Sequence, residues 1–218
     1  MRPRVKICCI LDEAEAAMAV DAGADCVGLV GPGLSGPEVR DEATIARIAK
    51  TLPPPVGGVL LTRETDPAAL VEQVRRCATP WVQICDDAPA DAWAALRTAL
   101  PNVRILQVVH VQGPAAIDRA RAIAPFVDAL LLDSGTPTGP NPVFGGTGRT
   151  HDWSISRAIV QTCGRPVFLA GGLRPENVTD AWRTVRPFGL DLCSGVRVGG
   201  RLDAGRLRAY FDAVAQLT

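Results

Sequence analysis

The chain has 218 residues with 23 basic and 23 acidic side chains, so its formal net charge at pH 7 is zero. This neutrality argues against nucleic acid or an anionic membrane surface as the main partner. Hydrophobic residues make up 47% of the chain, enough for a substantial core. No segment approaches the roughly 18 consecutive apolar residues of a membrane span, and the start of the chain lacks the features of a signal peptide. We therefore expect a cytoplasmic protein with no membrane partner.

Cysteine and histidine are scattered along the chain. Its seven cysteines contain no Cys-x-x-Cys spacing, and an odd number without an export signal predicts free thiols rather than disulfides. The two histidines, His110 and His151, are too few and too far apart to indicate a zinc site. We expect no metal.

Short apolar runs alternate with longer helical patterns, such as Asp12–Asp21, Asp41–Thr51 and Pro67–Ala78. This alternation predicts a parallel sheet covered by helices. Eight such units in a chain of this length favour a single (β/α)8 barrel domain over residues 1–218, with an open doubly wound sheet as the alternative. The predicted strands are, in chain order, Val5–Ile10, Ala24–Val30, Val56–Thr62, Trp81–Asp86, Arg104–Val111, Ala129–Ser134, Pro166–Ala170 and Gly189–Ser194.

The first predicted strand carries a candidate catalytic thiol. Because side chains alternate along a strand, Lys6 and Cys8 share one face and Ile7 points to the other. If Ile7 packs against the helices, Cys8 faces the barrel mouth, where substrates bind. The Lys6 ammonium would then favour a Cys8 thiolate that can act as a base. The alternative is that Cys8 is a small buried hydrophobe.

The sixth predicted strand ends at Asp133, which shares a face with Leu131. A carboxyl group there is costly to bury unless it is paired or lies at a solvated mouth. It is either an acid aimed into the mouth or a residue that starts the turn into Ser134. The long irregular segment Gly135–Thr150 follows, and a loop of this length at the mouth of a barrel favours a lid.

Glycine-bearing turns follow the last two predicted strands, at Gly171-Gly172 and at Ser194-Gly195. Glycine lets main-chain N–H groups approach an anion closely, and the corresponding loops of (β/α)8 barrels often bind phosphate. The alternative is that these residues only make tight turns. Asp191, on the eighth strand, is a second candidate carboxylate.

Together these motifs resemble the phosphoribosylanthranilate isomerase family, and the likeness covers nearly the whole chain. The matching segments are Lys6-Ile7-Cys8, Leu131-Leu132-Asp133, Phe144 to Thr150, Asp152-Trp153, Gly171 to Val178, and Ser194-Gly195-Val196.

The resemblance implies an Amadori rearrangement of an N-phosphoribosylated amine, from aminoaldose to aminoketose. It implies that Asp133 protonates the furanose ring oxygen and that Cys8 removes the proton from sugar C2. It implies no metal or organic cofactor, a small phosphosugar as partner, and a monomer or homodimer. By the same resemblance, Gly171, Gly172, Ser194 and Gly195 hold the phosphate and Asp191 lies near the ribose. We also expect Lys6, Arg40 and Gly146 to contact the substrate.

The chain departs from the family pattern at several positions. Pro37 stands where the family carries an Arg that pairs with the anthranilate carboxylate, and Cys85 stands in place of a His-Gly element. Cys9 replaces a glycine, and Arg197 replaces a Glu.

Three hypotheses follow from this mixture of agreement and departure. The protein acts on phosphoribosylanthranilate with Arg40 replacing the missing Arg, or it performs the same reaction on another amine. The third is a non-catalytic barrel that binds a phosphosugar or supports a partner enzyme.

Overall fold

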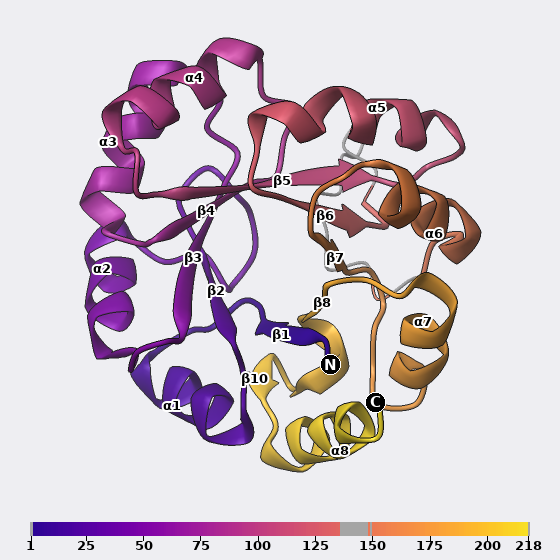
Figure 1. Cartoon of the computed structure of the whole chain (residues 1–218). Coiled ribbons are helices and arrows are strands. Elements are labelled where there is room, and N and C mark those ends of the chain that lie inside the picture. The colour runs from indigo at the N-terminus through magenta and orange to yellow at the C-terminus, as the bar shows by residue number, and fades with distance from the viewer. Residues whose placement is uncertain (1, 136–147, 149, 218) are drawn as a thin grey trace.

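The strands close into a parallel (β/α)8 barrel in the computed structural model, which describes residues 2–135, 148 and 150–217 (Figure 1). Within these residues β1 to β8 pair in chain order, and β8 pairs with β1. This closure confirms the predicted barrel and excludes the open sheet. The strands are β1 Arg4–Ile7, β2 Cys26–Val30, β3 Gly57–Thr62, β4 Trp81–Ile84, β5 Arg104–His110, β6 Ala129–Asp133, β7 Val167–Leu169 and β8 Gly189–Leu192.

Helices surround the strand ring, one after each strand (Figure 1). They are α1 Glu13–Ala22, α2 Glu42–Thr51, α3 Pro67–Cys77, α4 Ala90–Ala99, α5 Ala115–Ile123, α6 Trp153–Thr162, α7 Val178–Val185 and α8 Ala204–Ala215. Short 3-10 turns lie at η1 Ala124–Phe126 and η2 Ser194–Val196, and a small hairpin joins β9 Arg197–Val198 to β10 Arg201–Leu202. In the described part of the chain, no helix has the length and apolarity that crossing a membrane requires.

Aspartates begin several of the helices, which explains small errors in the predicted boundaries. The side chain of Asp12 accepts a hydrogen bond from the N–H of Glu15, and Asp41 does the same with Thr44. An N-cap of this kind satisfies an N–H group that has no partner inside the helix. These aspartates therefore lie just outside α1 and α2 rather than within them.

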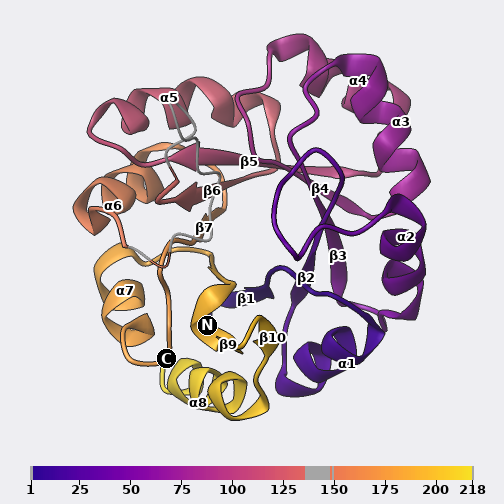
Figure 2. The same ribbon diagram turned by 180° about the vertical axis from the view of Figure 1, so that it is seen from behind.

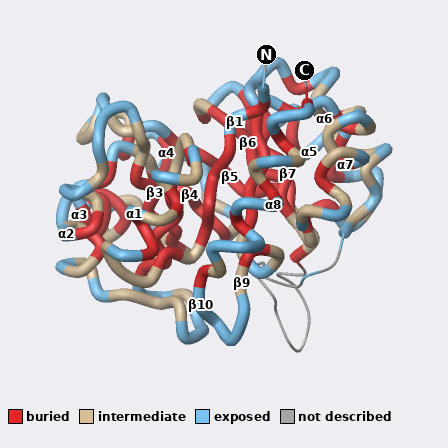
Figure 3. The backbone as a smooth tube through the Cα atoms, turned by 90° about the horizontal axis from the view of Figure 1, so that it is seen from below, coloured by how far each residue is buried: buried red, intermediate tan, exposed pale blue. Residues whose placement is uncertain are grey.

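Alternation along the strands sorts side chains into two layers. Ile7, Leu130 and Leu132 pack in the outer layer between strands and helices. Cys8 and Leu131 belong to an inner cluster. Figure 3 shows the strands as buried segments inside a more exposed periphery. The faces predicted for the first and sixth strands are therefore those that the structure has.

The two ends of the barrel differ in what they carry. The N- and C-terminal residues lie together at one end, whereas β9 and β10 lie at the other (Figure 3). The carboxyl ends of the parallel strands all meet at this second end. Seen from that side, the segment between β2 and α2 extends across the strand ends (Figure 2). These loops, and the last residues of the strands, build the site.

Candidate active site

A cavity of about 640 Å³ opens at the carboxyl end of the strands. Lys6 is buried beneath it, bonded to two of the side chains that line it, while Gly195 and Arg40 lie outside its lining. Gly146, predicted to contact substrate, and most of the predicted lid lie outside the described residues. The predicted site residues that line the cavity are Cys8, Asp133, Gly171, Gly172, Asp191 and Ser194.

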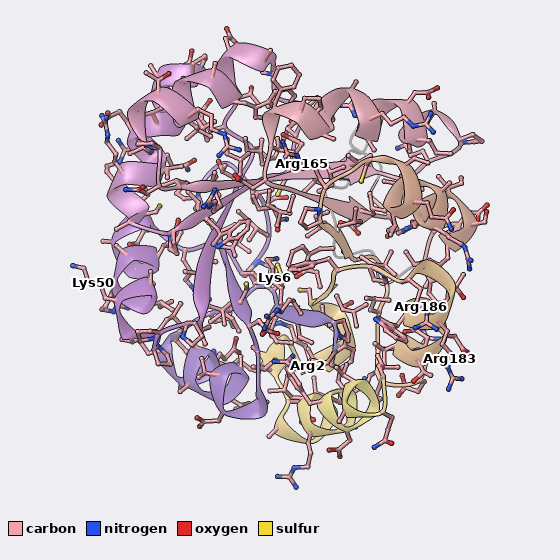
Figure 4. All side chains as sticks on the ribbon, in the orientation of Figure 1. Arg2, Lys6, Lys50, Arg165, Arg183 and Arg186 are labelled. Atoms are coloured by element: carbon pink, nitrogen blue, oxygen red, sulfur yellow. The ribbon has the colours of Figure 1, made fainter. Side chains whose placement is uncertain are left out.

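A buried ion pair forms the floor of the site. Strands β1 and β8 pair with Lys6 opposite Asp191, and the Lys6 Nζ lies 2.8 Å from Asp191 Oδ1 and 3.3 Å from Cys8 Sγ. Burial lowers the pKa of Lys6, but attraction to Asp191 and to Cys8 outweighs it and raises the pKa above its ordinary value. Figure 4 shows Lys6 in the middle of the strand ring, whereas Lys50 points outward. The Lys6 ammonium, paired with Asp191, therefore stays charged beside the Cys8 thiol.

Cys8 lies in a setting that favours its thiolate. A hydrogen bond from Cys9 lowers the pKa of the Cys8 thiol, burial opposes this, and the Lys6 charge lowers it further. Cys9 has φ 65°, in the left-handed region that suits glycine. The Cys9 sulfur lies 2.8 Å from that of Cys193, and the hydrogen bond with Cys193 raises the pKa of Cys9 well above its ordinary value. Cys9 therefore stays protonated and can donate to Cys8.

The pKa of Asp133 is shifted in the opposite direction, upward. Its carboxyl group is 8% exposed, and burial raises its pKa even though the N–H of Ser134 donates to it at 2.7 Å. His110 on β5 lies opposite it in the strand register and partly offsets the effect. A buried carboxyl group with a raised pKa keeps its proton closer to neutral pH. One cavity thus holds a thiol shifted toward a base and a carboxyl group shifted toward an acid, the usual pattern of an acid–base pair.

The end of the cavity at β7 and β8 is made of main chain, and we call it the phosphate end because the sequence predicts phosphate binding there. Gly171 and Gly172 have φ 80° and 63°, so other residues would be strained there. A Cβ added at Gly195 would overlap the main-chain oxygen of Leu173, so the two turns pack backbone against backbone. The Asn177 side chain fixes the first turn, since its Nδ2 donates to the Gly172 oxygen at 3.0 Å.

The end at β2 to β4, which we call the amine end, is made of side chains. They are Val30, Leu34, Ser35, Glu38, Leu61, Gln83 and Cys85. Glu38 and Gln83 were not among the predicted site residues. Gln83 shares a strand face with Cys85, a signal that could have identified it. Nothing in the local sequence indicates that Glu38 lines the cavity.

Arg40, predicted to contact substrate, anchors the loop that carries Glu38. Its Nε donates to the Leu11 oxygen at 2.8 Å, and its Nη1 donates to the oxygens of Pro37 and Val39 at 3.0 and 2.7 Å. The guanidinium therefore bonds to main chain beside the cavity.

Arg197 lines the cavity and forms a buried ion pair with Glu15 on α1, with 3.0 Å between Nη2 and Oε2. It also donates to the Cys9 oxygen and, at 2.8 Å, to the Gly200 oxygen. These bonds tie the loop after β1 to the segment after β8. In the described part of the chain, no three His, Cys, Asp or Glu side chains converge as ligands for a metal ion.

Comparison with known proteins assigns the family. The family model described as N-(5'-phosphoribosyl)anthranilate (PRA) isomerase matches residues 5–213. The N-(5'-phosphoribosyl)anthranilate isomerase of Halobacterium salinarum is 42% identical over 212 residues, covering 95% of this chain and 93% of that protein.

Two solved structures of phosphoribosyl anthranilate isomerases superpose on this chain, in agreement with that family assignment. The phosphoribosyl anthranilate isomerase of Thermotoga maritima superposes with a TM-score of 0.82 at 30% identity, over 98% of each chain. A second structure of a phosphoribosyl anthranilate isomerase, in complex with reduced 1-(o-carboxyphenylamino)-1-deoxyribulose 5-phosphate, has a TM-score of 0.79 at 28% identity, again over 98% of each chain. The chain therefore belongs to the N-(5'-phosphoribosyl)anthranilate isomerase family and is an aldose–ketose isomerase.

Proposed function

We propose that Cys8 and Asp133 carry out the Amadori rearrangement of an N-(5'-phosphoribosyl)amine as base and acid, respectively. The observation that carries this proposal is that both side chains line one cavity, from β1 and β6, with their pKa values shifted in opposite directions. One group gives a proton and the other takes one, as this reaction requires.

In the first step Asp133 donates its proton to the furanose ring oxygen, and the ring opens to a protonated Schiff base at C1. The Cys8 thiolate then removes the proton from C2, and the electron pair neutralises the iminium nitrogen to give an enolamine. The enolamine gains a proton at C1 and loses one from the C2 hydroxyl, which yields the aminoketose. The Lys6 ammonium supports the thiolate before the proton moves.

The remaining predicted residues position the sugar phosphate. The main-chain N–H groups of Gly171, Gly172, Ser194 and Gly195 hold the phosphate in this proposal. Asp191 lies next to the ribose hydroxyls while its other bonds hold Lys6. The left-handed glycines and the close packing of the two turns support this placement.

We also propose that the enzyme acts in the cytoplasm on a small-molecule phosphosugar, as a monomer or homodimer. All seven cysteines are free, and a reducing compartment preserves free thiols. Sedimentation of the purified protein measures its oligomeric state.

An assay of ketose formation tests the proposed reaction. Purified protein is mixed with N-(5'-phosphoribosyl)anthranilate and, separately, with the corresponding carboxamide, and the aminoketose is measured. We expect turnover of at least one substrate. Binding of both without any turnover would favour the hypothesis of a non-catalytic phosphosugar-binding barrel.

A further inference from the structure

We propose that the amine end of the cavity selects an arylamine whose ring carries a hydrogen-bond donor, such as a carboxamide, instead of the anthranilate carboxylate. Glu38 is the residue that sets this preference. The inference rests on the proposed function, because it names the amine part of the proposed substrate.

The position of the amine follows from the other parts of the site. The phosphate end lies at β7 and β8, and Cys8 and Asp133 reach the cavity from β1 and β6. In the closed strand order, β2 to β4 are the strands that remain on the far side from β7. A substrate with its phosphate at β7 and β8 and its C1–C2 bond beside Cys8 must therefore extend its amine substituent toward β2 to β4.

Gln83 is a neutral polar residue in the wall of that end. Its side chain is 4% exposed, lines the cavity, and has no partner for Oε1 among the described residues. Its Nε2 instead donates to Cys85 Sγ at 3.5 Å. Burial raises the pKa of Cys85 to about 12, so the thiol is neutral and its sulfur can accept this bond. Because Oε1 has almost no accessible surface and a rotated amide would present nitrogen in place of oxygen, Gln83 brings no charge to balance a substrate carboxylate but does not itself choose between the two groups.

Glu38 adds a negative charge at the same end. Its half-buried side chain lines the cavity from the loop that follows β2. A carboxylate on the substrate ring would meet a like charge, whose repulsion grows as solvent is excluded. An amide or amino group would instead donate to a charged acceptor, one of the stronger kinds of hydrogen bond.

The neighbouring cations are engaged elsewhere. Among the described residues that line the cavity, Arg197 is the only Lys or Arg, and its guanidinium is paired with Glu15. Arg40 bonds to three main-chain oxygens beside the cavity. Within the described residues, the amine end therefore offers acceptors without a cation to balance a substrate carboxylate.

The decisive experiment compares two substrates of almost the same shape, N-(5'-phosphoribosyl)anthranilate and N-(5'-phosphoribosyl)-2-aminobenzamide. We expect kcat/KM to favour the carboxamide by about tenfold to a hundredfold, the usual effect of one bond to a charged group. Glu38→Arg should reverse the preference, because a guanidinium pairs with a carboxylate, and Glu38→Gln should reduce it. Glu72→Gln is the matched control. It removes a carboxylate from an exposed pair with Arg75 on α3 and should leave the ratio unchanged.

Binding provides a second readout that does not depend on turnover. The reduced, unreactive product analogues of the two substrates are titrated by calorimetry, and Kd should show the same preference. Tighter binding of the carboxylate, or a ratio that Glu38→Arg does not move, would overturn the inference while leaving the isomerase reaction intact. Tight binding of the carboxamide analogue without turnover of either substrate would instead overturn the proposed function and keep the selectivity.

Discussion

The phosphate end of the cavity is built from main chain, whereas the amine end is built from side chains. At the phosphate end, Gly171 and Gly172 hold left-handed backbone, and Gly195 lies against the Leu173 carbonyl. At the amine end, Glu38 and Gln83 present side chains from a loop and a strand.

This difference separates positions that tolerate substitution from positions that do not. A turn that requires left-handed φ or a close backbone approach tolerates almost nothing but glycine. A side chain on a loop can be exchanged without disturbing the fold, and a single charge reversal alters which ligands fit. We therefore expect ligand preference to diverge at the amine end while the sugar-phosphate end stays the same.

The largest expected effect is on kcat, and it comes from substituting Cys8 or Asp133, which lie between the two ends. Cys8→Ser and Asp133→Asn should each lower kcat by about a hundredfold to ten-thousandfold, because a positioned base or acid contributes that much. Since neither change touches the glycine turns or Glu38, Kd for a reduced product analogue should change by less than about threefold. Single-turnover measurements separate the chemical step from product release. Near-native kcat in either variant would remove that residue from the mechanism.

A smaller effect is expected at the phosphate end. In Gly195→Ala the added methyl group meets the Leu173 oxygen, so the turns must separate, at about 1–3 kcal/mol of stability. The KM of the phosphorylated substrate should rise by roughly tenfold, whichever amine it carries.

Gly113→Ala is the control for this variant, because a Cβ there meets nothing within 4 Å. Its stability should stay within about 0.5 kcal/mol of wild type. Thermal unfolding and steady-state kinetics measure both variants. If Gly195→Ala unfolds at a lower temperature but binds phosphorylated ligands normally, the phosphate lies elsewhere.

The smallest effect on selectivity is expected from Arg40→Ala at the amine end. Loss of its bonds to three main-chain oxygens should lower the free energy of unfolding by about 1 kcal/mol. The ratio of kcat/KM for the carboxylate and carboxamide substrates should change by less than about twofold, because the guanidinium bonds to backbone. A selective loss of activity on the carboxylate substrate would instead show that Arg40 binds it, as the first sequence-based hypothesis holds.

The sequence by itself was sufficient for the barrel and for the faces of its strands. Alternating apolar runs predicted each strand, because a buried parallel strand needs apolar residues on both faces. Period-two alternation placed Cys8 on the face opposite Ile7 and Asp133 on the face opposite Leu132, and the structure shows that Ile7 and Leu132 are on the outside. The strand ends were predicted too long, since β1 ends at Ile7 and β8 at Leu192. Apolar character continues past the point where ladder pairing stops.

Tertiary structure alone decided which distant side chains meet. The contact of Lys6 with Asp191 spans 185 residues and exists because β8 closes onto β1. Glu38 lines the cavity, whereas Arg40, two residues away, bonds to the main-chain oxygens of its own loop and of Leu11. Irregular loops have no fixed period, so their side-chain directions depend on the bonds available in the folded chain. The sequence therefore identified Cys8 and Asp133 as residues of the cavity, whereas the composition of the amine end required the folded protein.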